Sequence, residues 1–321
     1  MSEDLANEIK SHAVRELGFD VVGITDAERL EGAPHLARWL EAGRHGEMTY
    51  MASSADVRVD PARFLRGARS VICVAMSYHD SAEPPELVPR GSRIVVARYA
   101  RRRDYHKVIK KRLVRLGRFL SERIPDATWR AACDTAPLLE KELAQRAGLG
   151  WIGKNTCLIN RRLGSELLLG ELVTSVALPA DTPETDHCGT CTACLAACPT
   201  SAFDGPHRLD PRRCVAYLTI EHRGTLPGPF LPALGAHLFG CDICQAVCPW
   251  NQRATPRHSP QLAMLPELAN LSLSSFSDLD RAGWERMAAG TPLRRLDYPR
   301  LERNLAAVAA NLESAGDSLR P

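Results

Sequence analysis

The feature that most constrains this sequence is a group of eight cysteines between residues 188 and 248, out of eleven in the whole chain. Four of them follow the pattern C-x2-C-x2-C-x3-C and end in Cys198 and Pro199; three more follow C-x2-C-x3-C and end in Cys248 and Pro249. The first pattern is the spacing of bacterial iron–sulfur proteins, in which the fourth cysteine binds the second of two clusters. The sequence therefore predicts two [4Fe–4S] clusters.

The same crossing rule assigns the ligands of each cluster. By symmetry Cys248 returns to the first cluster, and Cys214, the one cysteine between the two runs, completes the second. We expect the first cluster to be held by Cys188, Cys191, Cys194 and Cys248. We expect the second cluster to be held by Cys198, Cys214, Cys241 and Cys244.

Zinc and disulfide bonds are the alternatives for these cysteines. Zinc sites use paired C-x2-C motifs in sets of four, which three cysteines at two-residue gaps followed by C-P fit poorly. Disulfides need an oxidising compartment, and the N-terminal residues lack the basic and apolar regions of a secretory signal. Outside the two runs, Cys73, Cys133 and Cys157 lie in apolar surroundings and are expected to be buried, inert thiols.

Composition indicates a globular protein that we expect to be cytoplasmic. The net charge of +3 is too small to predict a nucleic-acid partner, and no apolar run approaches the length of a membrane helix. Basic residues are nevertheless concentrated between 90 and 123, where only Asp104 and Glu122 oppose them. Such a run is either a solvated helix face or a phosphate-binding surface.

The pattern of apolar residues predicts a mixed α/β fold. Strands are expected at 20–24, 70–78, 93–99, 127–132 and 167–178. Helices are expected at about 3–17, ending at Gly18, and at about 104–120, where an apolar stripe repeats every three or four residues. Loops are expected at 81–92, which is rich in proline, and at 224–235.

These elements suggest three segments. Residues 1–180 form an N-terminal domain built on a mixed sheet, 181–255 a two-cluster ferredoxin-like domain, and 256–321 a short C-terminal helical segment. The first segment has neither the glycine pattern of a dinucleotide site nor a phosphate-binding P-loop. The residues alone therefore predict a reductase whose second cofactor is not visible.

The sequence resembles the epoxyqueuosine reductases, a family of cobalamin-dependent iron–sulfur enzymes related to the reductive dehalogenases. The resemblance covers nearly the whole chain, and its most specific motifs are RDYH (103–106), CDTAP (133–137) with GWIGKN (150–155), and YLTIEHRG (217–224) ahead of CDICQAVCPWN (241–251). Longer members carry a C-terminal helical-repeat domain, of which this chain has only the opening at 291–312.

The resemblance implies a reaction, a cofactor and a substrate. The reaction removes the epoxide oxygen of epoxyqueuosine at the wobble base of a tRNA, which consumes two electrons and two protons and releases water. Cobalamin would supply the reduced metal, and an external low-potential donor would reduce the clusters. Corrin contacts are implied at Val57, Arg58, Ala97, Asp134, Leu158, Leu169 and Asp242.

Asp134 is the proton donor that the resemblance implies. A carboxylic acid can donate to a departing oxygen only if its pKa is raised toward neutrality, which burial beside an apolar corrin would achieve. From the local sequence alone, Asp and Thr ahead of Pro137 are equally typical of a helix N-cap.

A flipped anticodon base is read by stacking and edge contacts, while basic side chains hold the phosphates. The implied substrate or tRNA contacts are Tyr105, His106, Arg101, Lys107, Lys111, His222 and Arg223. Tyr105 and His106 could instead be structural residues at a helix start.

Two further hypotheses remain open at this point. A corrinoid reductase of a small molecule would bind cobalt without changing tRNA nucleosides, and a ferredoxin-type electron carrier would contain iron and sulfide without cobalt. In each case we expect a monomer that does not enter a membrane.

Overall fold

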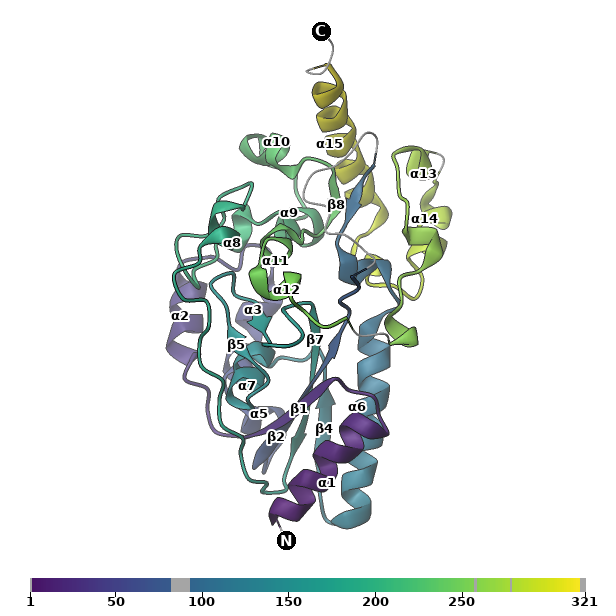
Figure 1. The fold of residues 1–321 in the computed structure, drawn as a ribbon. Coiled ribbons are helices and arrows are strands. Elements are labelled where there is room, and N and C mark those ends of the chain that lie inside the picture. Colours follow the sequence, from purple (N-terminus) through teal and green to yellow (C-terminus); the bar gives the residue numbers. More distant parts are fainter. Residues whose placement is uncertain (1, 82–92, 257–258, 278, 318–321) are drawn as a thin grey trace.

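The computed structural model describes residues 2–81, 93–256, 259–277 and 279–317. A four-stranded sheet lies at the centre of the lower part of the molecule in Figure 1. Its strands, in spatial order, are β1 (Val21–Asp26), β2 (Ser70–Ser77), β7 (Leu167–Thr174) and β4 (Trp129–Ala132). The predicted α/β composition is confirmed, and four of the five predicted strands form this sheet.

The prediction of a mixed sheet is wrong, because every neighbouring pair in the four-stranded sheet is antiparallel. Strands β2 and β4 do run parallel to each other, and the long connection through α6 is of the kind that parallel strands need. However, β7 inserts between them and runs opposite to both. Parallel pairing occurs instead between two short strands outside this sheet, β3 (Val95–Val96) and β8 (His237–Phe239).

One face of the sheet is covered by α1 (Ser2–Arg15) and α6 (Tyr105–Arg123) (Figure 1). The side chain of Asp104 caps α6 by accepting the backbone N–H of His106. The predicted apolar stripe of α6 is fully buried and includes Ile109, Leu113, Leu116 and Leu120. Gly18, at φ +69°, ends the turn that follows α1 in a left-handed conformation that suits glycine.

The opposite face packs against α7 (Glu140–Arg146) and α5 (Pro61–Phe64). Leu143 and Ala144 of α7 are buried against alternate residues of β2 and β7, including Cys73 and Val173. The loop from 133 to 139 joins the end of β4 to α7. The sheet therefore fixes both ends of this loop, which carries Asp134.

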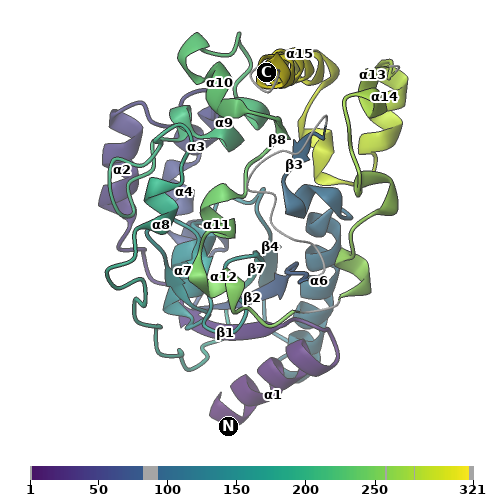
Figure 2. The same cartoon turned by 45° about the horizontal axis from the view of Figure 1, so that its top comes forward.

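A third core joins the segments. Val95 and Val96 of β3 and Leu238 and Phe239 of β8 pack in one cluster with Trp284 and other residues of the C-terminal segment. Figure 2 shows α13, α14 and α15 gathered at this end of the molecule, away from α1. The C-terminal segment is helical as predicted, while the boundaries at 180/181 and 255/256 stay a prediction.

The remaining elements are short. The other strands are β5 (Trp151–Ile152) and β6 (Leu158–Ile159). The other helices are α2 (Ala33–Glu41), α3 (Thr49–Ser53), α4 (Ala55–Arg58), α8 (Ala193–Ala196), α9 (Val215–Ile220), α10 (Leu231–Leu234), α11 (Ile243–Ala246), α12 (Pro249–Gln252), α13 (Ser274–Ser277), α14 (Arg281–Ala288) and α15 (Tyr298–Asp317). The 3₁₀-helices are η1 (Arg98–Arg101), η2 (Pro211–Arg213), η3 (Gly228–Phe230), η4 (Pro260–Leu262), η5 (Pro266–Leu268) and η6 (Pro292–Arg295).

Two local predictions need correction. The strand expected at 93–99 is limited to Val95 and Val96, because the chain then turns into η1, where the carboxylate of Asp242 accepts the backbone N–H of Arg98 at 2.7 Å. The loop expected at 224–235 contains η3 and α10, each begun with a proline in its first turn. Most of the proline-rich loop expected at 81–92 lies outside the described residues. None of the helices in the described ranges is long and apolar enough to span a membrane.

Candidate functional site

The eight cysteines of the two runs fall into two groups in space. Cys194 and Cys248 each lie within electrostatic reach of both Cys188 and Cys191. Cys241 interacts in the same way with Cys198 and Cys214, and Cys244 interacts with Cys214 and Cys241. These neighbours agree with the two sets of four that the crossing rule gives, while the assignment of each set to a cluster stays a prediction.

The surroundings of these thiols fit iron–sulfur clusters. Backbone N–H groups point at several sulfur atoms: Ala202 donates to the Cys198 Sγ at 3.3 Å, and Ala216 and Tyr217 donate to Cys214. Such hydrogen bonds tune the reduction potential of a cluster. Among the described residues no three His, Cys, Asp or Glu side chains converge to hold a single metal ion. A [4Fe–4S] cluster does not need such convergence, because its four thiolates bind four different iron atoms at separate corners of the cluster.

The three remaining cysteines differ from one another. Cys73 and Cys133 are buried as predicted, and burial raises the pKa of each thiol. Cys157 is only partly buried and its thiol hydrogen-bonds to that of Cys244. The prediction of a buried, inert thiol is therefore wrong for Cys157, because the turn between β5 and β6 carries it to the edge of the second cysteine set.

Asp134 lies on the loop after β4 in a conformation that is unusual for a residue other than glycine. Its φ angle is +51°, in the left-handed region. The N-cap of α7 is Leu139, five residues further on, so the N-cap alternative for Asp134 does not hold. The side chain is 56% exposed, and its Oδ2 accepts a hydrogen bond from the His106 Nε2 at 2.9 Å.

His106 connects two carboxylates. Its Nδ1 donates to the Asp104 Oδ1 at 2.7 Å while its Nε2 faces Asp134. Burial lowers the pKa of His106, but the hydrogen bonds to Asp134 and Asp104 outweigh burial and raise it above its ordinary value. The hydroxyl of Tyr105 also hydrogen-bonds to Asp134. The two residues of the RDYH motif therefore contact Asp134 directly.

The expected rise in the pKa of Asp134 is not found. Burial does raise it, but the hydrogen bond and charge of His106, followed by the hydroxyl of Tyr105, outweigh burial and lower the pKa of Asp134 below its ordinary value. The proton of this pair therefore resides on His106, with Asp134 as its acceptor. The sequence pattern could not indicate this, because it did not show that α6 brings His106 to the loop.

The residues implied as corrin contacts come from elements around Asp134. Arg58 at the end of α4 interacts electrostatically with Asp134 and is 8% exposed. Tyr99 lies within electrostatic reach of both Asp134 and Asp242. Val57, Leu158 and Leu169 belong to the apolar cluster between the sheet and α7, and Ala97 is buried directly before η1. Tyr99 is thus a common neighbour of the two carboxyl groups.

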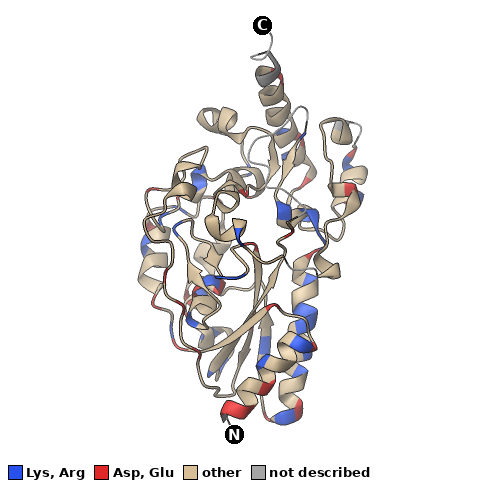
Figure 3. Ribbon diagram, in the orientation of Figure 1, with Lys and Arg blue, Asp and Glu red and all other residues tan. Residues whose placement is uncertain are grey.

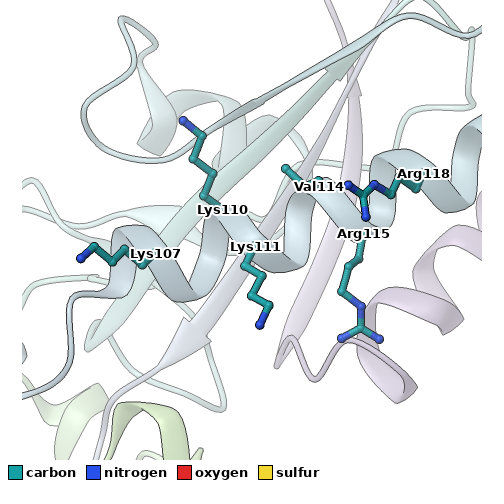
Figure 4. A pocket seen from close by; sticks show the side chains of 6 residues that line it. All are labelled: Lys107, Lys110, Lys111, Val114, Arg115 and Arg118. Carbon is teal, nitrogen blue, oxygen red and sulfur yellow. The ribbon is translucent and has the colours of Figure 1, made fainter. Parts of the chain in front are cut away.

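The residues implied as tRNA contacts do not form one surface. Lys107 and Lys111 are exposed on α6, where they line a depression of about 530 Å³ with Lys110, Val114, Arg115 and Arg118 (Figure 4). Figure 3 shows the basic positions along this helix. Arg101 does not belong to this surface, since η1 turns it inward and leaves it 7% exposed. Arg223 is exposed after α9, and His222 is half-buried beside Glu47.

Several residues of the site were not predicted from the sequence. Arg295 of η6 interacts with Asp134 and is held by two hydrogen bonds to the carboxylate of Glu221 at 3.0 Å. The ring of Tyr50, which is 40% exposed, lies between the guanidinium groups of Arg58 and Arg295 at 5.7 and 5.5 Å. These residues come from three distant segments, so no local pattern could have grouped them.

The geometry of the cysteines and the carboxylate site defines an iron–sulfur oxidoreductase. A family model described as "4Fe-4S double cluster binding domain" matches residues 187–251. A second, described as "Epoxyqueuosine reductase QueG, DUF1730", matches residues 58–135.

Individual proteins give a more specific result. The chain is 46% identical to the epoxyqueuosine reductase of Pseudomonas aeruginosa over 320 residues, covering 97% of this chain and 86% of that protein. A crystal structure of an epoxyqueuosine reductase with an epoxyqueuosine-modified tRNA stem loop matches with a TM-score of 0.87 and 28% identity, covering 98% of this chain and 83% of the other. An epoxyqueuosine reductase from Bacillus subtilis, whose catalytic aspartate loop is swung out of the active site, matches with a TM-score of 0.86 and 28% identity, again covering 98% and 83%. The chain belongs to the epoxyqueuosine reductase family.

The ligand assignment predicts the effect of removing Cys214. A Cys214→Ala variant, purified without oxygen, should lose the second cluster and fall from about eight to about four iron atoms per chain. The matched variant Cys133→Ala removes a buried thiol outside both sets and should keep the full iron content. Iron and sulfide analysis with EPR spectroscopy measures both. Full iron content in the Cys214 variant would show that another residue holds the second cluster.

Proposed function

We propose that this chain reduces epoxyqueuosine in tRNA to queuosine, with Asp134 and His106 supplying a proton to the epoxide oxygen. The observation that carries the proposal is the half-exposed carboxylate of Asp134, 2.9 Å from the His106 Nε2, in a chain 46% identical to an epoxyqueuosine reductase. Removal of the oxygen as water requires two electrons and two protons. We also propose that the protein acts in the cytoplasm, where it would meet tRNA.

His106 and Asp134 act together as the acid. The imidazolium form of His106 is favoured because both its ring nitrogens donate to carboxylates. Exclusion of water from the Asp134 carboxylate by a bound tRNA would strengthen the effect of burial, which raises the pKa of Asp134. The proton would then move from the His106 Nε2 to the Asp134 Oδ2 and on to the leaving oxygen. The second proton comes from solvent.

Apolar side chains near Asp134 and the guanidinium of Arg58 are the groups that would contact a corrin. Tyr99 lies within electrostatic reach of both Asp134, the proposed acid, and Asp242, the neighbour of Cys241. We infer that the corrin of cobalamin is held there by Val57, Arg58, Ala97, Leu158, Leu169 and Asp242. When bound, its cobalt supplies the two-electron reductant that clusters carrying one electron each do not provide. Asp242 also hydrogen-bonds the backbone of Arg98, which ties the second cysteine set to this region.

The basic face of α6 fits the phosphates of the tRNA. The helix begins at Tyr105, which hydrogen-bonds to Asp134, and Lys107 and Lys111 follow on its exposed side. Phosphate contacts from such residues set the position of the RNA while base contacts select the nucleotide. Arg295 of η6 lies within electrostatic reach of Asp134, and Arg223 is exposed after α9. We infer that the anticodon loop lies between these two groups.

Replacement of Asp134 tests the proposed acid. An Asp134→Asn variant should retain both clusters and cobalamin while its turnover of epoxyqueuosine tRNA falls by about 10²- to 10⁴-fold, the usual contribution of a general acid. The matched variant Asp56→Asn alters an exposed carboxylate on α4 and should keep full turnover. Mass spectrometry of the nucleosides measures the product. Full turnover in the Asp134 variant would rule out the assignment.

Charge reversal on α6 tests the tRNA surface. A Lys107→Glu, Lys111→Glu double variant should bind tRNA about tenfold more weakly at moderate salt and show a shallower dependence of affinity on salt, because two phosphate contacts are lost. The control is Arg66→Glu with Arg69→Glu, two exposed residues between α5 and β2. Fluorescence anisotropy with a labelled anticodon stem loop measures the affinity. Equal weakening by both double variants would show that only net charge matters.

A further inference from the structure

Two glutamates lie beneath the loop that carries Asp134. Glu140 is the first residue of α7, and Glu171 is in the middle of β7, where it pairs with Cys73 of β2 and Ala132 of β4. The loop from 133 to 139 leaves β4 directly after Ala132 and ends at Glu140. Both glutamates are therefore placed by regular elements at the base of this loop.

Glu171 is fully buried and has no ordinary hydrogen-bond donor. Its side chain is 0% exposed, and neither carboxyl oxygen accepts a hydrogen bond from a donor group among the described residues. Burial and then the charge of Glu140 raise the pKa of Glu171 well above its ordinary value, and the two carboxyl groups lie close enough for a hydrogen bond between them. Two carboxyl groups can form such a bond only when at least one of them carries a proton.

Glu140 connects this buried group to the loop. Its Oε1 accepts the backbone N–H of Asp134. Burial, followed by the charge of Asp134, raises the pKa of Glu140 to about 7. The backbone of Asp134 is in the left-handed region at φ +51°, and such a conformation persists only where surrounding contacts hold it. The hydrogen bond from Glu140 is one of these contacts.

We propose that Glu140 and Glu171, hydrogen-bonded through a carboxyl proton, form the positioning element that holds the Asp134 loop against the sheet, and that ionisation of the pair releases the loop. Neither glutamate touches the substrate; they act through the backbone of Asp134. The importance of this loop contact for catalysis rests on the proposed role of Asp134 as the acid. In the Bacillus subtilis relative, the catalytic loop is swung out of the active site. A loop of this kind therefore has an open position to which it can move when the contact that holds it closed is lost.

The direction of the pH effect follows from the raised pKa. A glutamate with an ordinary pKa of about 4.5 in the open loop and about 7 in the closed loop favours closure at low pH. That preference is lost as the pH rises through about 7. Other charged or titratable groups also face the pair and the loop. They are Asp134 and Cys133 on the loop, His106 and Tyr105 on α6, Arg295 on η6, Cys73 on β2 and Arg58 on α4.

Since the pKa of His106 is also raised, its pairing with Asp134 stabilises the closed loop at low pH, and this contribution is likewise lost as the pH rises. The contribution of Glu140 must therefore be isolated by a variant that cannot ionise. Glu140→Gln keeps the size of the side chain and an oxygen that can accept the Asp134 N–H. Glu142→Gln is the matched control, because Glu142 lies on the same helix and accepts a backbone N–H from Gly32 at 2.9 Å.

Hydrogen–deuterium exchange tests the proposal. The protection factors of residues 133–139 are measured in the cluster-loaded protein at pH 6 and at pH 8. The wild type should lose protection between these values, and in Glu140→Gln the loss should be about tenfold smaller, which is the contribution of a pKa shift from 4.5 to about 7. Glu142→Gln should follow the wild type. Glu140→Ala should lose about tenfold in protection already at pH 6, since the hydrogen bond is removed.

The proposal would be overturned if Glu140→Gln and the wild type lost protection equally between pH 6 and pH 8. It would also be overturned if the loop of Glu140→Ala kept the protection factors of the wild type at pH 6. Because exchange is measured without substrate, these outcomes are independent of whether Asp134 is the acid. If Asp134→Asn did not reduce turnover, the assignment of Asp134 as the acid would be rejected, but the proposal that the two glutamates position the loop would still stand.

Discussion

The close packing of α6 on β7 is the contact on which the arrangement of this site depends. Gly170 of β7 makes it possible, since a Cβ at this position would lie 2.5 Å from the Ile109 Cγ2 of α6. With α6 this close to the sheet, its first turn reaches the end of β4, and His106 meets Asp134. A larger residue at 170 would push the helix outward and separate the histidine from the carboxylate.

The same strand organises the opposite side of the sheet. Glu171, next to Gly170, points toward α7 and meets Glu140. Adjacent residues of β7 thus face opposite sides, as in any strand, and serve different purposes. Gly170 admits the helix that carries the proposed proton source, and Glu171 supports the loop that carries the proposed acid. Asp134 is held from both directions by residues that one strand places.

The parts of the site that could be predicted are those encoded in local spacing. The grouping of seven cysteines followed from the intervals within each run, and Cys214 was added as the one cysteine between the runs; neighbouring cysteines in the structure agree with these sets. The strands and the buried stripe of α6 followed from apolar periodicity. The antiparallel order of the sheet did not, because nothing in the sequence indicates that β7 inserts between β2 and β4. Arg101 was assigned to the basic surface because it precedes α6, but the turn at η1 buries it.

The location of the proton shared by His106 and Asp134 could not be predicted from the sequence, because it depends on tertiary contacts. The motif implied an acid at Asp134, while the histidine that holds the proton, the arginine from η6 and the buried Glu171 are distant in sequence. The central claim is that this assembly reduces epoxyqueuosine in tRNA. Its most direct test is nucleoside mass spectrometry of tRNA from a strain that lacks this gene, with and without the gene restored. Epoxyqueuosine should accumulate in the deletion strain and be converted to queuosine on complementation. A deletion strain with normal queuosine and no epoxyqueuosine would contradict the claim.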